Sequence, residues 1–187
     1  MEPVITINKS IFTAKIYSDN YPMNPREDQD NIGIINLSTL KNYDLTDKEN
    51  YLSITDLIND NSNKLIILPI YAYIHSGITI SLSPFSCKWD SGLAGFIYCN
   101  PSDYGITRED LKGILKTEVA TLNQYLTNDV YKIEITNNQT EEELFSCYGY
   151  YGYTYAYTEA EGLLKYFTTT TYKQKTFVFS GEKNEEL

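Results

Sequence analysis

The stretch from Thr107 to Asn128 carries the strongest structural signal in this sequence. Its apolar residues recur at intervals of three and four, which predicts a helix with one buried face. They are Leu111, Ile114, Leu115, Val119, Leu122 and Leu126. Thr107 is placed as an N-cap, and Asp110 follows it three residues later. We expect the apolar face of this helix to pack on a sheet.

Short apolar runs with strand character lie on both sides of this helix. We predict strands at residues 4–7, 11–17, 65–74, 78–82, 93–99 and 130–135, with a further short apolar piece at 32–37. Thr158-x-x-Glu161 predicts a shorter terminal helix through about Phe167, and Lys175 to Phe179 is predicted as a final strand. Asp44 to Asn63 is polar, with one weak helical pattern. The predicted fold class is α+β: a mixed, mainly antiparallel sheet packed against one long helix and a shorter C-terminal helix.

Length and composition predict one folded domain. The chain has 187 residues, of which 42% are hydrophobic, so we expect a single domain over 1–187 with an acidic tail at about 181–187. The first residues lack a basic region followed by a long apolar one, and the longest apolar run is too short to cross a bilayer. We therefore expect a cytoplasmic protein without membrane contact. The three cysteines have no Cys-x-x-Cys spacing, which predicts reduced, mostly buried thiols and no zinc site. No cofactor is predicted.

Negative charge is spread unevenly along the chain. The net charge is −10; residues 1–60 carry 5 basic and 10 acidic groups, whereas residues 61–135 carry 6 and 7. Direct binding of duplex DNA needs a basic surface, so this balance argues against it. The same balance permits binding to a basic groove of another protein. Acidity that serves only solubility is the alternative.

The only histidine and the only tryptophan lie in two similar clusters, His75-Ser76-Gly77 and Trp89-Asp90-Ser91-Gly92. His75 and Asp90 are candidate catalytic residues, with His75 as general base and a serine or Cys87 as nucleophile. The alternative is a structural histidine that binds a neighbouring backbone group or carboxylate. We expect Trp89 to be a core residue or an anchor in a binding interface.

Candidate binding residues also lie in a tyrosine-rich segment near the C-terminus. Tyr148, Tyr150, Tyr151 and Tyr153 are interleaved with glycines, and tyrosines 151, 153, 155 and 157 are expected on one strand face. Exposed tyrosines suit a protein-binding surface; the alternative is a packed edge strand. Glu141, Glu142 and Glu143 precede this segment and are expected to face a basic partner.

A loop led by two prolines contributes two further candidates for binding, Arg26 and Asp30. Its oxygen-rich side chains are of the kind that bind a hard cation, but EF-hand spacing is absent. A solvated loop held by its own local hydrogen bonds is the other interpretation.

Several motifs together resemble one protein family. They are Asn24-Pro25-Arg26-Glu27 with Asp30-Asn31-Ile32-Gly33, Tyr43-Asp44-Leu45, His75-Ser76-Gly77-Ile78-Thr79, Ser83-Pro84-Phe85-Ser86-Cys87-Lys88-Trp89-Asp90-Ser91-Gly92, Gly95-Phe96-Ile97-Tyr98 and Asp129-Val130-Tyr131. The chain resembles, over about residues 20–152, an uncharacterised family of small acidic proteins encoded by bacteriophages and mobile elements of Gram-positive bacteria. It departs from that pattern at Gln29, where the family has an aromatic residue, and at 35–39, where the family has a Cys-x-His segment.

The resemblance implies a role against host defence, because such small acidic proteins are similar to anti-CRISPR proteins. We therefore expect an inhibitor that binds a host defence protein, a CRISPR effector nuclease, in the host cytoplasm. The alternative is a hydrolase or nuclease centred on His75 and Asp90 that acts on guide RNA or another nucleic acid. A maintenance protein of the mobile element is a third possibility. Stoichiometry separates the first two, because an enzyme acts below one equivalent.

Overall fold

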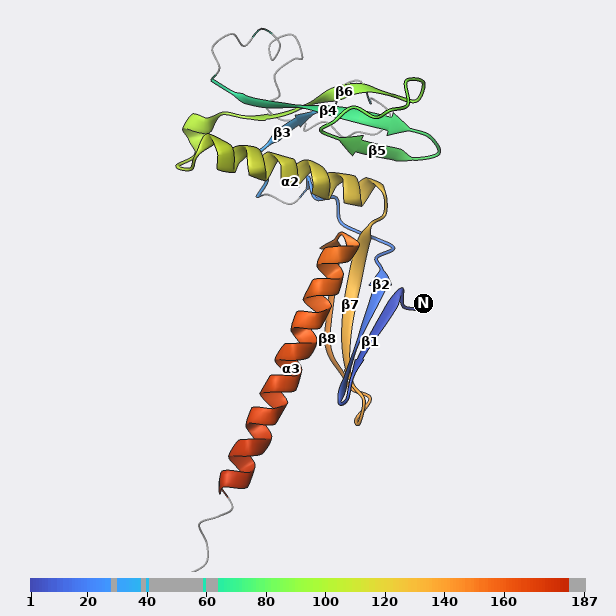
Figure 1. Ribbon diagram of the computed structural model, residues 1–187, viewed down its shortest axis with the longest axis vertical. Coiled ribbons are helices and arrows are strands. Elements are labelled where there is room, and N and C mark those ends of the chain that lie inside the picture. The colour runs from blue at the N-terminus through green and yellow to red at the C-terminus, as the bar shows by residue number, and fades with distance from the viewer. Residues whose placement is uncertain (28–29, 38–39, 41–58, 60–63, 182–187) are drawn as a thin grey trace, which may run out of the picture. The chain divides into compact units, whose positions relative to one another are not determined.

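The computed structural model describes residues 1–27, 30–37, 40, 59 and 64–181 (Figure 1). The chain divides into two compact units. The terminal unit consists of Met1–Pro22 and Asn128–Leu187, and the central unit of Met23–Thr127. Each unit has its own four-stranded antiparallel sheet and its own hydrophobic core. The α+β class is confirmed, with two sheets in place of one, and a single domain over the whole chain stays a prediction.

In the terminal unit, one α-helix covers one face of a sheet ordered β1-β2-β7-β8. The strands are β1 (Ile5–Lys9), β2 (Phe12–Ser18), β7 (Val130–Asn137) and β8 (Glu143–Tyr151), and the helix is α3 (Tyr153–Gly181). The core of the terminal unit is formed by Phe12, Ala14, Ile16, Ile133, Ile135, Ala156, Ala160 and Leu164. Along β2 and β7 these residues alternate with more polar ones, so one sheet face packs on α3. The predicted opening hairpin is confirmed.

The C-terminal helix differs from the prediction in length and start. It has 29 residues against the 19 of the central helix, so it is the longer of the two. Residues 153–157 are helical rather than extended, and the strand predicted at 175–179 is wrong because α3 runs through it. Ala156, Ala160 and Leu164 recur every four residues and are fully buried, which is the packing that holds the helix on its sheet.

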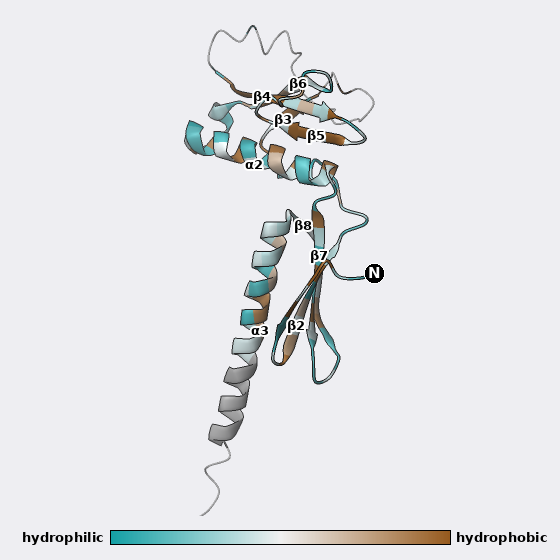
Figure 2. Cartoon of the chain, turned by 45° about the vertical axis from the view of Figure 1, so that its right-hand side comes forward, coloured by the Kyte–Doolittle hydropathy of each residue, from teal (hydrophilic) through white to brown (hydrophobic). Residues whose placement is uncertain are grey.

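In the central unit, α2 (Arg108–Leu126) packs on a sheet ordered β3-β6-β4-β5. The strands are β3 (Ile34–Asn36), β4 (Ile66–Ile74), β5 (Ile78–Ser81) and β6 (Ser91–Cys99), and the 3-10 helix η2 (Pro101–Asp103) follows β6. The buried residues of α2 are Leu111, Leu115, Val119 and Leu122, as the spacing predicts. Figure 2 shows β5 in the brown of hydrophobic residues. At this edge strand, the Asn123 side chain accepts the Ile80 N–H at 2.8 Å.

The structure also bears on the expected absence of a membrane span and on the expected burial of the cysteines. Neither α2 nor α3 combines the length and the apolar character that a membrane span needs. The three cysteines are free thiols: Cys99 is buried, Cys87 half-buried and Cys147 exposed. The prediction of mostly buried thiols is therefore right only for Cys99. The predicted helical pattern between Asp44 and Asn63 lies almost wholly outside the described residues.

Candidate functional site

His75 and Asp90 come together at one end of the β4–β6 strand pair. The Ile74 N–H donates to the Asp90 carbonyl at 2.8 Å, which places the start of β6 beside the end of β4. Ser76 adopts a φ of 54°, and the His75 N–H donates to the Gly77 carbonyl at 3.1 Å, so the chain turns directly after His75. The His75 Nδ1 lies 3.6 Å from Asp90 Oδ2. The two turns therefore meet at this end of the sheet.

One aromatic ring and one thiol contact this pair. The Tyr73 ring lies against the His75 ring with centroids 6.2 Å apart and an interplanar angle of 22°, and Phe85 lies on Tyr73 at 5.9 Å. The Cys87 thiol donates to the same Asp90 oxygen at 3.8 Å. The imidazole is 68% exposed and the Asp90 side chain 42% exposed, so water reaches both groups.

The order of these groups bears on the chemistry available to them. A nucleophilic relay needs the nucleophile on one imidazole nitrogen and the carboxylate on the other. Here the Cys87 thiol contacts the Asp90 carboxylate and not the imidazole of His75. The Ser76 hydroxyl donates to the His75 carbonyl at 2.6 Å, and the Ser91 hydroxyl donates to the Cys87 carbonyl. Within the described residues, the pair can therefore activate a water molecule, but it has no aligned side-chain nucleophile.

Trp89 lies on the surface next to this pair. Its side chain is 95% exposed, which rules out the core position that the sequence left open. It borders a depression of about 350 Å³ whose other lining residues include Ala72, Ile74, Asp90, Leu93 and Ala94. Ile74 and Leu93 are 39% and 48% exposed. Sequence reasoning missed them, because both lie in strands whose apolar residues were expected in the core.

Five tyrosines of the terminal unit cluster between two strands, β7 and β8, and the helix α3, not along one strand. Tyr150 on β8 contacts Tyr155 on α3, with ring centroids 6.0 Å apart. Tyr153 contacts Tyr131 at 5.8 Å and Tyr157 at 6.2 Å. We call these five residues the tyrosine cluster. Tyr155 is 54% exposed and Tyr153 is 37% exposed, so part of the cluster is accessible. Burial raises the pKa of the Tyr131 hydroxyl and that of the Tyr150 hydroxyl above the ordinary value of tyrosine. Tyr151, also predicted for binding, is half-buried.

Tyr148 lies on the opposite sheet face, away from α3. Its ring centroid is 4.8 Å from the Lys132 amine, which also lies 5.9 Å from the Tyr17 ring. Lys132 forms an ion pair with Glu134, and hydrogen bonds to Glu134 and Tyr148 raise the pKa of this amine. Tyr148 is nevertheless 61% exposed. Sequence reasoning missed Tyr17 and Glu134, which neighbour Lys132 only through strand pairing.

Glu141, Glu142 and Glu143 lie at the turn between β7 and β8, and all three are exposed. We call them the acidic turn. Glu141 has a φ of 59°, and the Asn137 N–H donates to the Glu142 carbonyl at 2.9 Å, which closes the turn. At a rise of about 3.3 Å per residue, the acidic turn and Tyr150 lie at opposite ends of β8, roughly 20–25 Å apart.

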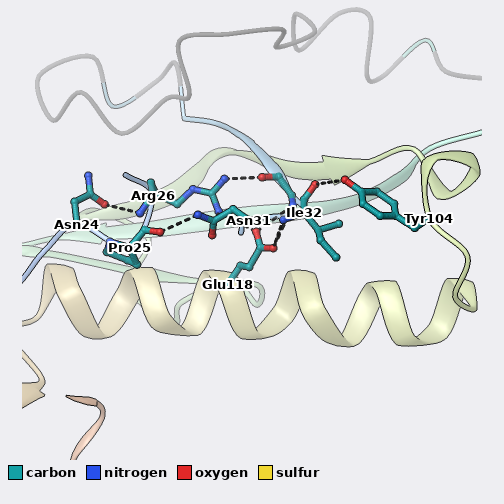
Figure 3. A network of polar contacts seen from close by, with 8 residues as sticks. Asn24, Pro25, Arg26, Asn31, Ile32, Tyr104 and Glu118 are labelled. Atoms are coloured by element: carbon teal, nitrogen blue, oxygen red, sulfur yellow. Dashed lines mark hydrogen bonds and ion pairs between the residues drawn. The ribbon is translucent and has the colours of Figure 1, made fainter. Parts of the chain in front are cut away.

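The loop before β3 holds Arg26 in the interior of the central unit (Figure 3). The guanidinium donates to Asn31 and Glu118, each at 2.8 Å, and the Glu118 carboxylate also accepts the Ile32 N–H at 2.7 Å. Arg26 and Glu118 are 8% and 10% exposed, so Arg26, which the sequence offered as a binding residue, is a buried structural residue. Asp30 is exposed. No group of three metal-binding side chains occurs among the described residues.

Comparisons with known proteins gave no match to a family model, a curated protein or a solved structure. The resemblance to proteins of mobile elements stays a prediction.

Proposed function

We propose that this chain is a phage-type inhibitor that binds a bacterial defence nuclease, a CRISPR effector, and blocks its nucleic-acid binding or cleavage. The observation that best supports this proposal is that two candidate binding surfaces lie along the same strand, β8. The acidic turn lies at one end of the strand, and the tyrosine cluster lies at the other. Exposed carboxylates can occupy a groove whose basic side chains otherwise hold phosphates.

The two surfaces supply different parts of the binding free energy. Charged groups at the rim of an interface chiefly speed association, whereas buried aromatic anchors slow dissociation. Tyrosine brings a large contact area and loses little side-chain entropy on binding. The two surfaces lie roughly 20–25 Å apart along β8, a separation that one standard interface of about 800 Å² per partner can span.

A titration tests binding against catalysis. A fixed concentration of the effector, loaded with guide RNA, is mixed with increasing amounts of the chain, and target cleavage is measured. An inhibitor that binds reaches full effect at a fixed, near-integral ratio to the effector. Full inhibition at a small fraction of one equivalent would contradict binding and favour an enzyme.

Matched charge variants test the surface. We expect the triple variant Glu141→Gln, Glu142→Gln, Glu143→Gln to need about tenfold more protein for half-inhibition, because the on-rate falls. The control is Glu2→Gln, Glu27→Gln, Glu161→Gln, which removes the same charge from three exposed positions elsewhere. An equal loss in both variants would show that only net charge matters.

A second candidate function is supported by the 3.6 Å approach of His75 to Asp90. In this alternative, His75 activates a water molecule that cleaves guide RNA or another nucleic acid. Incubation of the chain with guide RNA alone tests it. Cleavage that is lost in both His75→Ala and Asp90→Asn, with unchanged unfolding midpoints, would support the hydrolytic candidate, and intact RNA would remove it.

A further inference from the structure

The Trp89 depression has an apolar floor and a charged rim. Ala72 and Ala94 at its floor are 4% and 2% exposed, and Ile74 and Leu93 expose apolar surface beside them. The lining also includes the Asp90 carboxylate, whose side chain is 42% exposed, and the Trp89 indole, together with Leu40, Ser91 and Gly92. Tryptophan is highly buried on average, and an exposed indole has a large area to bury on contact with a partner.

Gly92 leaves space in this depression. It lines the depression and is paired with Ala72 across the β4–β6 ladder. A Cβ at Gly92 would have no heavy atom within 4 Å apart from those of its chain neighbours. A side chain at this position would therefore occupy open space without disturbing the fold.

We propose that the Trp89 depression binds an arginine side chain of a protein partner. The guanidinium is planar, so it can form two parallel hydrogen bonds with the Asp90 carboxylate and stack on the Trp89 indole. Its methylene stem would cover the apolar floor. This inference goes beyond the proposed function, because it needs no particular target.

Charge and shape favour arginine over other occupants. An acidic side chain would meet the Asp90 carboxylate and a chain of net charge −10. A neutral apolar side chain would take water from the Asp90 carboxylate and supply no cation, leaving it only His75 and the Cys87 thiol, which is costly. A lysine can pair with Asp90, but its compact ammonium cannot form the two-point contact or stack as a plane.

The single tryptophan makes the test direct, because intrinsic indole fluorescence reports only on Trp89. The probes are two capped pentapeptides, acetyl-Gly-Ala-Arg-Ala-Gly-amide and the same peptide with citrulline in place of arginine. Citrulline keeps the shape and removes the charge. We expect a saturable change in emission with the arginine peptide, at least tenfold weaker affinity for the citrulline peptide, and weaker binding of the arginine peptide at high salt.

Two variants locate the binding, and one controls for charge. Asp90→Asn removes the carboxylate charge, and Gly92→Val fills the depression with a residue that favours strands. Each should weaken binding of the arginine peptide at least tenfold with an unchanged circular dichroism spectrum. Asp103→Asn, at an exposed position in η2, should leave it within twofold.

Three outcomes would overturn the inference: equal affinity for the two peptides, unchanged affinity in both Asp90→Asn and Gly92→Val, or no saturable signal at all. Equal affinity would indicate an apolar docking site without charge selection. Because these measurements use no effector, they can fail while inhibition persists, and inhibition can fail while they succeed.

Discussion

Arg26 and Glu118 lie 92 residues apart in the sequence and form a buried ion pair, with Arg26 Nη1 2.8 Å from Glu118 Oε2. Glu118 is on α2, whereas Arg26 is in the loop that precedes β3. The same guanidinium donates to the Gly33 carbonyl at 2.5 Å, and Glu118 accepts the Gly33 N–H at 3.1 Å. The Glu118 carboxylate therefore holds the loop before β3 against α2 through hydrogen bonds.

Replacing Glu118 should destabilise the chain strongly. Glu118→Ala leaves a buried guanidinium and two backbone N–H groups without this carboxylate, so we expect a loss of about 3–5 kcal/mol in the free energy of unfolding. Urea denaturation followed by circular dichroism measures the loss.

An exposed ion pair on the same helix gives the control for Glu118→Ala. Lys112 and Glu109 lie 3.6 Å apart with side chains 42% and 78% exposed. Lys112→Ala should therefore cost less than about 1 kcal/mol. Equal losses in the two variants would show that burial of the Arg26–Glu118 pair contributes nothing.

Leu115→Ala should open a cavity in the core of the central unit. Leu115 is fully buried on the face of α2 that the sequence predicts, and removing three heavy atoms there should cost about 2–5 kcal/mol. The measurement is the urea midpoint. Lys116→Ala, one residue further and exposed, should change stability by less than about 0.5 kcal/mol. An unchanged midpoint for Leu115→Ala would contradict the packing of α2.

Patterns that repeat within a few residues were predictable from the sequence. Leu111 and Leu115 on α2, and the alternating residues of β2 and β7, report burial through spacing alone. The Arg26–Glu118 pair was not predictable, because nothing local to either residue indicates a partner 92 positions away.

The start of α3 shows the same limit. Gly152, with a φ of 89°, precedes the helix, and the Tyr153 N–H donates to the Asp129 side chain at 3.1 Å. The capping carboxylate lies 24 residues upstream, whereas the cap predicted from local sequence is Thr158. That error turned the first helical tyrosines into an expected strand.

The candidate site was predictable in part. The turns at His75 and Asp90 bracket β5, a predicted single strand that can fold back on its neighbour, and the pairing of β4 with β6 brings the two turns together. The exposure of Ile74 and Leu93 could not be predicted, because it depends on where the apolar faces of β4 and β6 extend beyond the core. Apolar spacing alone does not distinguish a residue in the core from a residue that lines a surface depression.

Acid should weaken the terminal unit through Glu134. Burial by itself raises the pKa of this carboxyl, but hydrogen bonds from Lys132 and Tyr17 outweigh it and hold the pKa below its ordinary value of 4.5. A carboxyl with a lowered folded pKa stabilises the fold above the unfolded pKa, and this stability is lost as pH falls through the folded value.

The pH test for Glu134 compares the parent chain with Glu134→Gln between pH 3 and 7. Unfolding midpoints in urea should fall more steeply below pH 4.5 for the parent chain than for the variant, because the other carboxyls are common to both. Parallel curves would show that the contact with Lys132 does not favour the ionised form of Glu134.

The acidic turn should govern how fast the proposed complex forms. Attraction between exposed charges is screened over about 8 Å at physiological ionic strength, so association should slow as salt rises. The triple change of Glu141, Glu142 and Glu143 to glutamine should lower the on-rate at low salt and flatten its salt dependence, with little effect on the off-rate. Replacing Tyr155, which is 54% exposed, by alanine should instead speed dissociation. Surface-immobilised kinetics at low and high salt separate the two effects. An on-rate indifferent to both salt and the triple change would show that these carboxylates serve solubility, and would leave water activation by His75 as the better explanation of any inhibition.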